Sequence, residues 1–154
     1  MKESRILIGC TTSDKSWLKN IQKWESKGLL EDANIIPQAL DSRFHSKAEV
    51  KAHLLDRIEE MDICVLLLGD TRLPELWLEA IVELCRRLKV RLICLRIPQT
   101  KIPKPETLKS YVELVFNPNA ILSQIRRARH NRENDIINET DLFQDHGDTK
   151  AFFG

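Results

Sequence analysis

The sequence lacks the long apolar runs and the charge imbalance that mark membrane proteins and nucleic-acid-binding proteins. No apolar run approaches the roughly 18 residues of a membrane-spanning helix, and Met1–Arg5 passes into a strand of only about four apolar residues, too short for a signal peptide. The chain has 24 basic and 23 acidic residues, for a formal net charge of +1. We therefore expect no membrane contact, and binding to nucleic acid is not favoured.

Glycine and cysteine are scarce, and neither occurs in the arrangements that hold cofactors or metals. The five glycines form neither a GxGxxG nor a P-loop motif, so the usual dinucleotide and P-loop sites are excluded. The cysteines have no CxxC spacing and no histidine partners, and all stand in apolar segments: Cys10, Cys64, Cys85 and Cys94. We expect reduced, buried thiols in a cytoplasmic protein without disulfide bonds, a metal site or a bound cofactor.

The most informative stretch of the chain runs from Asp62 to Ile97. Residues 62–68 (DICVLLL) and 91–97 (RLICLRI) are apolar runs without polar alternation, which is typical of parallel strands covered on both faces. The residues between them have helical periodicity and end near Lys89. Strand, helix and strand form a βαβ unit, whose ligands usually bind in the polar loop at the carboxyl end of the first strand.

The rest of the pattern extends this unit into a larger sheet. Further strands are predicted over residues 5–10, 33–40 and 112–116, and further helices over 16–27, 46–61, 106–110 and from 120 onward. Pro37 favours an edge position for the second strand, and Gly28 is placed to end the first helix. Ser46 and Glu49 have the spacing of a capping box.

This order of elements predicts an α/β fold. Residues 1–133 are expected to form one flavodoxin-like, doubly wound domain with about five parallel strands. Residues 134–154 form a polar, acidic tail that still contains aliphatic and aromatic side chains. Many functions share this fold, so the function has to be argued from the loops at the carboxyl ends of the strands.

The loop after the first strand excludes one common function and weakens another. A phosphoacceptor receiver needs an acidic pair there, whereas this loop has Thr11-Thr12 and a single acid, Asp14. A flavin site needs hydroxyls and a backbone that wraps around phosphate. Thr11, Thr12 and Ser13 supply hydroxyls, but no glycine accompanies them, so a flavin is only weakly indicated.

Three segments between residues 5 and 97 resemble the TIR-like family of bacterial proteins. They are the loop Ser13-Asp14-Lys15-Ser16-Trp17, the run from Val50 to Met61 leading into the third strand, and Leu68-Gly69 followed by Thr71 and Trp77. The resemblance implies a TIR-like, flavodoxin-like fold and self-association. It also implies antiphage defence of the Thoeris type, in which such domains cleave NAD+ at the nicotinamide–ribose bond.

The resemblance further implies a catalytic glutamate four residues after the tryptophan, where this chain has Ile81. The carboxylates that could replace it are Glu75, Glu79 and Glu83. At about 100° per residue, Glu79 lies nearly opposite the expected position. Each glutamate also has an ordinary explanation: Glu79 and Glu83 suit a solvated helix face, and Glu75 complements the helix dipole.

Four other residues are candidates for contacting a nucleotide. Thr11, Asp14 and Asp70 lie in loops that meet at the carboxyl edge of the sheet, where the aspartates could bind ribose hydroxyls. Trp77 could line a nicotinamide or adenine pocket. We favour the simpler alternatives, in which the aspartates cap the helices that follow them and the tryptophan belongs to the core.

Three functions from different classes remain open. The leading hypothesis is a TIR-like signalling domain that binds or cleaves NAD+-type nucleotides. Such a domain would form homo-oligomers or pair with a TIR-like partner. If it is an enzyme, it would be an NAD+ glycohydrolase or cyclase. The second is a non-catalytic TIR-like assembly module, which Ile81 favours. The third is a nucleoside deoxyribosyltransferase-like enzyme, whose acidic, glycine-rich approach to the helix is poorly matched by Asp70-Thr71-Arg72.

Overall fold

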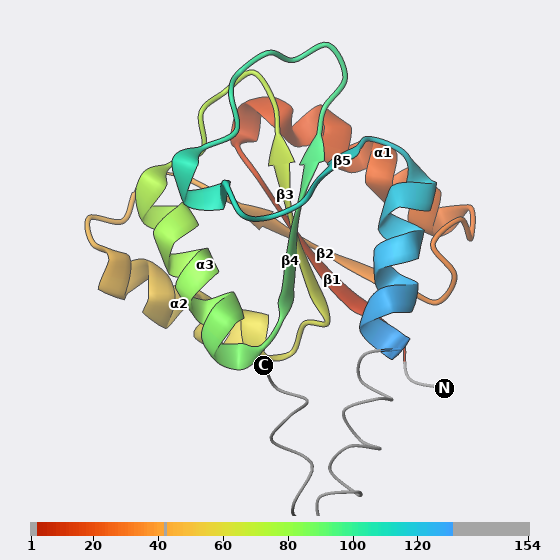
Figure 1. Ribbon diagram of the computed structural model, residues 1–154, viewed down its shortest axis with the longest axis horizontal. Helices are drawn as coiled ribbons and strands as arrows, with labels where there is room; N and C mark the ends of the chain where they lie inside the picture. The colour runs from red at the N-terminus through yellow and green to blue at the C-terminus, as the bar shows by residue number, and fades with distance from the viewer. Residues whose placement is uncertain (1–2, 42, 131–154) are drawn as a thin grey trace, which may run out of the picture.

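The computed structural model describes residues 3–41 and 43–130, and their strands form one parallel sheet (Figure 1). Its five strands have the spatial order β2-β1-β3-β4-β5. The bounds are β1 Arg5–Cys10, β2 Asn34–Ala39, β3 Ile63–Leu68, β4 Arg91–Arg96 and β5 Glu113–Val115. This is the flavodoxin-like order, which reverses direction between β1 and β3. The predicted fold class is confirmed.

Helices cover both faces of the sheet. The helices α2 and α3 lie on one face, while α1 and the helical segment 118–130 lie on the other (Figure 1). Their bounds are α1 Lys15–Ser26, α2 Lys47–Glu59 and α3 Glu75–Leu88, with short 3-10 helices η1 Thr12–Asp14 and η2 Glu106–Leu108. The predicted tail, residues 134–154, lies outside the described residues.

The central strand β3 explains why its sequence is continuously apolar. All six of its residues are buried, and they alternate between two separate cores. Cys64, Leu66 and Leu68 join the core beneath α2 and α3, whereas Val65 and Leu67 join the core beneath α1 and residues 118–130. A strand with a solvated face would need a polar residue at every second position.

Three local predictions are confirmed at element ends. The Ser46 hydroxyl accepts a hydrogen bond from the Glu49 backbone N–H at 3.2 Å, which caps α2. Gly28 adopts a positive φ of 77° after α1, and the following Leu29 N–H donates to the Trp24 carbonyl at 2.9 Å. Pro37 lies in β2, which is the terminal strand in the sheet order, where its missing N–H costs no ladder bond to a further strand.

All four cysteines are free and buried, as the sequence predicts. Burial raises the pKa of the Cys10 and Cys94 thiols from 9.0 to about 11. Hydrogen bonding to Cys85, together with burial, raises the pKa of Cys64 well above its usual value. These thiols therefore stay protonated at neutral pH and act as small apolar groups in the two cores.

The cysteines should accordingly be inert toward DTNB in the folded protein at about pH 8 and react fully in guanidinium chloride. Raised thiol pKa values also make the folded state lose stability with increasing pH. For Cys10 and Cys94 that contribution is complete below pH 9.0 and is lost as the pH rises toward 11. Rapid modification of any thiol under native conditions would contradict this description of the cores.

Candidate functional site

The loops after β1 and β3 are joined by hydroxyl contacts at the carboxyl edge of the sheet. The hydroxyls of Ser13 and Thr71 are hydrogen-bonded at 2.6 Å. The Thr11 hydroxyl lies 3.0 Å from that of Ser13 and donates to Asp14 Oδ2 at 3.2 Å. This network lies where the strand order reverses, which is the usual ligand position in such sheets. Thr11 and Asp14, both predicted from sequence, are therefore brought together.

Asp14 fills the space in front of β3. Its side chain is buried, with 6% of the residue exposed, and it lies directly against Gly69. A Cβ atom added to Gly69 would stand 2.5 Å from the Asp14 carboxyl carbon, so only glycine allows this approach. The cavity beside Gly69, Thr71 and Arg72 has a volume of only about 10 Å³. The crevice expected at this point is thus closed by an acidic side chain.

The expectation that the two aspartates cap helices is wrong. Asp14 occupies the N-cap position of α1, but its carboxylate makes no capping bond because it is turned toward Thr11 and Gly69. The N-cap of α3 is Pro74, whose extended backbone leads into the helix, and Asp70 stands earlier in the loop with an exposed side chain.

Desolvation is the main reason that the pKa of Asp14 is raised above 3.8. The hydrogen bond from Thr11 opposes this rise, and the negative charge of Asp70 adds to it. Asp14 therefore holds a proton more readily than an ordinary aspartic acid. Such a group can donate or accept a proton, which is a common property of functional carboxyls.

A cavity of about 160 Å³ opens beside this network, between the ends of β1 and β2 and the start of α1. Thr11, Lys15 and Gln38 line it together with apolar groups. Gln38 is 6% exposed, and its Nε2 donates to the Ala39 carbonyl at 3.0 Å. Its Oε1 has no hydrogen-bond partner among the described residues. The cavity therefore offers a cation and hydroxyl groups to a small polar group.

Gln38 is the residue that sequence reasoning missed. The only signal was a polar side chain directly after Pro37 inside an otherwise apolar strand. That pattern also fits a solvent-facing position of an edge strand, where the residue would carry no function. Gln38 shares its strand face with Ile36 and Leu40, which pack in the core beneath α2 and α3, and the strand sequence alone does not reveal this packing.

Two of the predicted catalytic glutamates lie on the face of α3 toward α2. Glu83 forms ion pairs with Lys47 at 2.6 Å and with Lys51 at 3.6 Å. The hydrogen bond from Lys47 is the main reason that the pKa of Glu83 is lowered. Glu79 is half-buried, and its charge also acts on Lys47.

The other α3 candidates also have clear partners. Glu75 is exposed and accepts a hydrogen bond from the Thr107 hydroxyl of η2. Ile81 is fully buried in the core beneath α2 and α3. Trp77 is 1% exposed, stacks edge-on against Phe44 at 5.5 Å, and donates its Nε1–H to the Asp41 carbonyl. Thus α3 turns its tryptophan and isoleucine inward.

Within the described ranges 3–41 and 43–130, no cluster of three histidine, cysteine, aspartate or glutamate side chains could hold a metal ion. In the same ranges, no helix is both long and apolar enough to span a membrane.

Comparison with known proteins shows a likeness to solved structures and none to a family model or a curated protein. No protein-family model matches the sequence, and no curated protein does either. The chain is similar to the solved TIR domain of the Toll-related receptor TRR-2 from Hydra magnipapillata, with 16% sequence identity and a TM-score of 0.45. The alignment covers 85% of this chain and 96% of the Hydra domain.

The packing of Asp14 against Gly69 predicts the outcome of a substitution pair. Gly69→Ala should lower the free energy of unfolding by about 1–3 kcal/mol, because its methyl group overlaps the buried carboxyl. In an Asp14→Ala background that overlap is removed, and the same change should cost less than about 1 kcal/mol. Urea denaturation of the four proteins measures this coupling. Equal costs in both backgrounds would show that the two residues do not touch.

Asp14 should also make stability depend on pH. Because its folded-state pKa is raised, its stabilising contribution is present below pH 3.8 and is lost as the pH rises through the folded-state value. Asp14→Asn should therefore raise the melting temperature, relative to the unmodified protein, more at neutral pH than below pH 3.8. Thr11→Val, which removes the opposing hydrogen bond, should steepen the loss. A pH-independent difference for Asp14→Asn would contradict the assignment.

Proposed function

We propose that this protein is a TIR-like signalling domain that works as a non-catalytic assembly module. The observation that carries the proposal is the place of Ile81, which stands where TIR-like enzymes have their catalytic glutamate and is fully buried. N-glycosidic cleavage needs a carboxylate beside the reacting ribose carbon. An isoleucine packed between two helices and the sheet cannot provide one.

The surrounding carboxylates support this proposal. Glu83 is held by two lysines of α2, and Glu75 is held by Thr107 of η2. Turning either side chain toward a ribose bound at the carboxyl edge would break these contacts. Of the two aspartates at that edge, Asp14 is closed off against Gly69 and Asp70 is exposed to solvent.

A second candidate function is binding of an NAD+-type nucleotide at the carboxyl edge. It is favoured by the 160 Å³ cavity, which is lined by Thr11, Thr12 and Lys15. Sites for whole ligands usually measure about 300–1,000 Å³, so this cavity suits one group, such as the nicotinamide amide or a ribose. A cytoplasmic role in antiphage defence would follow from the family resemblance for either candidate.

The sheet offers a surface for assembly with a second copy of the chain. β5 is the terminal strand in the sheet order, and it carries Val115, which is 72% exposed. Val112, just before the strand, is 42% exposed. Exposed valines beside an open strand edge favour pairing with another strand. The β5 edges of two copies can pair with each other about a two-fold axis, so this interface needs no other protein.

Sizing by chromatography with light scattering tests the proposal over a range of protein concentrations. The protein should self-associate as its concentration rises, and Val115→Lys should keep it monomeric because the new charge would be buried at the interface. Leu29→Lys is the matched control, since Leu29 is 44% exposed but lies after α1. It should leave association unchanged.

Two results would overturn the proposal. One is a monomer at every concentration, or equal loss of association in both lysine variants. The other is NAD+ turnover above background that disappears in Glu75→Gln, Glu79→Gln or Glu83→Gln, because that would restore the enzymatic alternative. Melting temperatures of all variants verify that each one folds.

A further inference from the structure

The Asp14 side chain holds a place that is electrostatically unfavourable. It is buried against Gly69 in front of β3. The Thr11 hydroxyl donates to its carboxylate, and within residues 3–41 and 43–130 no cation forms an ion pair with it. Burying a carboxylate without a cation costs free energy. Stability alone therefore does not explain why an aspartate occupies this place.

Asp14 belongs to a segment that is attached to the rest of the protein by few contacts. The 3-10 helix η1 has only three residues, and two of them, Thr12 and Ser13, are exposed. The hydroxyl bond between Ser13 and Thr71 ties η1 to the loop after β3, and it is exposed to solvent. Short exposed segments with few buried contacts open locally at a low cost in free energy.

The same carboxylate has a second place available at the N-terminus of α1. Asp14 stands at the N-cap with φ −101° and ψ 10°, and its side chain makes no capping bond. With an extended backbone, an N-cap carboxylate accepts the N–H groups two or three residues later, here those of Ser16 and Trp17. The positive end of the helix dipole favours the negative charge there. This change requires the Lys15 N–H to leave the Thr12 carbonyl, which unwinds η1.

Unwinding of η1 opens the cavity of about 160 Å³ between the ends of β1 and β2 and the start of α1. Thr12 of η1 lines this cavity, and Thr11 lines it while holding the Asp14 carboxylate. Moving that carboxylate away extends the space toward Gly69. Cys10 also lines the cavity and is only 3% exposed, so its thiol reports whether the cavity is open or closed.

We propose that Asp14 is a movable plug. Its carboxylate closes the carboxyl-edge crevice in this structure and moves to the N-terminus of α1 when η1 unwinds. The hydroxyl bond between Ser13 and Thr71 is the latch that holds the closed form. The device requires neither assembly through β5 nor a bound nucleotide, so it goes beyond the proposed function.

The test compares Asp14→Ala with Asp14→Asn in the full chain. The small neutral reagent methyl methanethiosulfonate modifies exposed thiols, and peptide mass spectrometry follows each cysteine separately. Burial, and then the charge of Asp14, raise the pKa of Cys10. Both variants remove that charge, whereas only Asp14→Ala removes the plug. Cys10 should therefore react at least about tenfold faster in Asp14→Ala than in Asp14→Asn, because its exposure sets the difference.

Thr71→Val is a second variant, which leaves Asp14 in place. It removes the hydroxyl partner of Ser13 and should raise the Cys10 rate about threefold to tenfold, the factor expected when the closed form loses one hydrogen bond. Thr12→Val is the matched control, because Thr12 is exposed and its hydroxyl forms no hydrogen bond within the described residues. It should change the rate less than about twofold.

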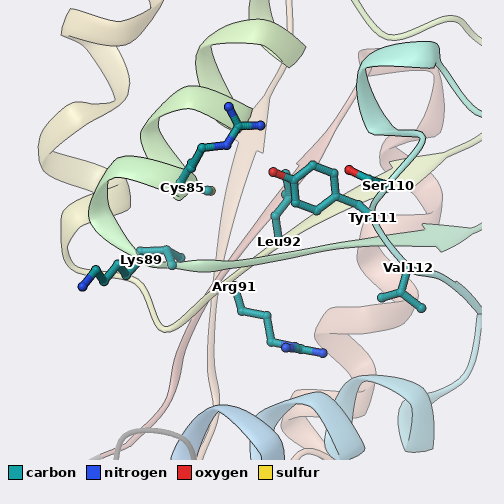
Figure 2. A pocket seen from close by; sticks show the side chains of 9 residues that line it. Cys85, Lys89, Arg91, Leu92, Ser110, Tyr111 and Val112 are labelled. Carbon is teal, nitrogen blue, oxygen red and sulfur yellow. The ribbon is translucent and has the colours of Figure 1, made fainter. Parts of the chain in front are cut away.

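Cys85 is the internal reference. It is buried and lines a separate cavity of about 430 Å³ between the end of α3 and the start of β4 (Figure 2). Its rate should stay the same in every variant, since a general loosening of the fold would expose it as well. Equal Cys10 rates in Asp14→Ala and Asp14→Asn would overturn the inference. Parallel acceleration of Cys10 and Cys85, or equal effects of Thr71→Val and Thr12→Val, would also overturn it.

Discussion

Burial of β3 on both faces is the constraint on which the rest of the structure depends. The strand contributes alternate residues to two cores, so it requires helices above and below it and strands on both sides. The parallel sheet, in which β1 and β4 flank β3, meets these requirements. It also brings the end of β3 against the loop after β1, where Gly69 meets Asp14. The space in front of β3 is therefore filled because the loops after β1 and β3 approach closely at Asp14 and Gly69.

Local signals in the sequence predicted the elements well because short-range physics decides them. Gly28 ends α1 because it tolerates a positive φ, Ser46 caps α2 with its own hydroxyl, and Pro37 suits an edge strand. The direction of the Asp14 side chain was not predictable in this way. Asp14 stands at the N-cap position of α1, yet its carboxyl lies against Gly69, which is 55 positions later in the chain and has no side chain in the way.

The candidate sites were harder to predict because they arise from elements that are distant in sequence. Gln38 becomes buried only when its strand face, which it shares with Ile36 and Leu40, packs beneath α2 and α3. A second cavity, between the end of α3 and the start of β4, lies where β4 extends beyond the shorter β5. A difference in strand length has no signature in the sequence of either strand. Ile81 is the opposite case, because a residue four positions after Trp77 lies on the same face of the helix, and both side chains are buried.

Charge is divided between the two ends of α3 in the way that the helix dipole favours. Glu75 begins the helix, and Arg86 and Arg87 occupy its last turn. The dipole alone would account for these three residues. It does not account for Arg91, which belongs to a strand, is half-buried, and hydrogen-bonds to a neutral amide while another arginine lies nearby. Burying a cation without an anion is costly. Partial exposure of Arg91 and its hydrogen bond to Gln124 offset this cost on the face of the sheet beneath residues 118–130.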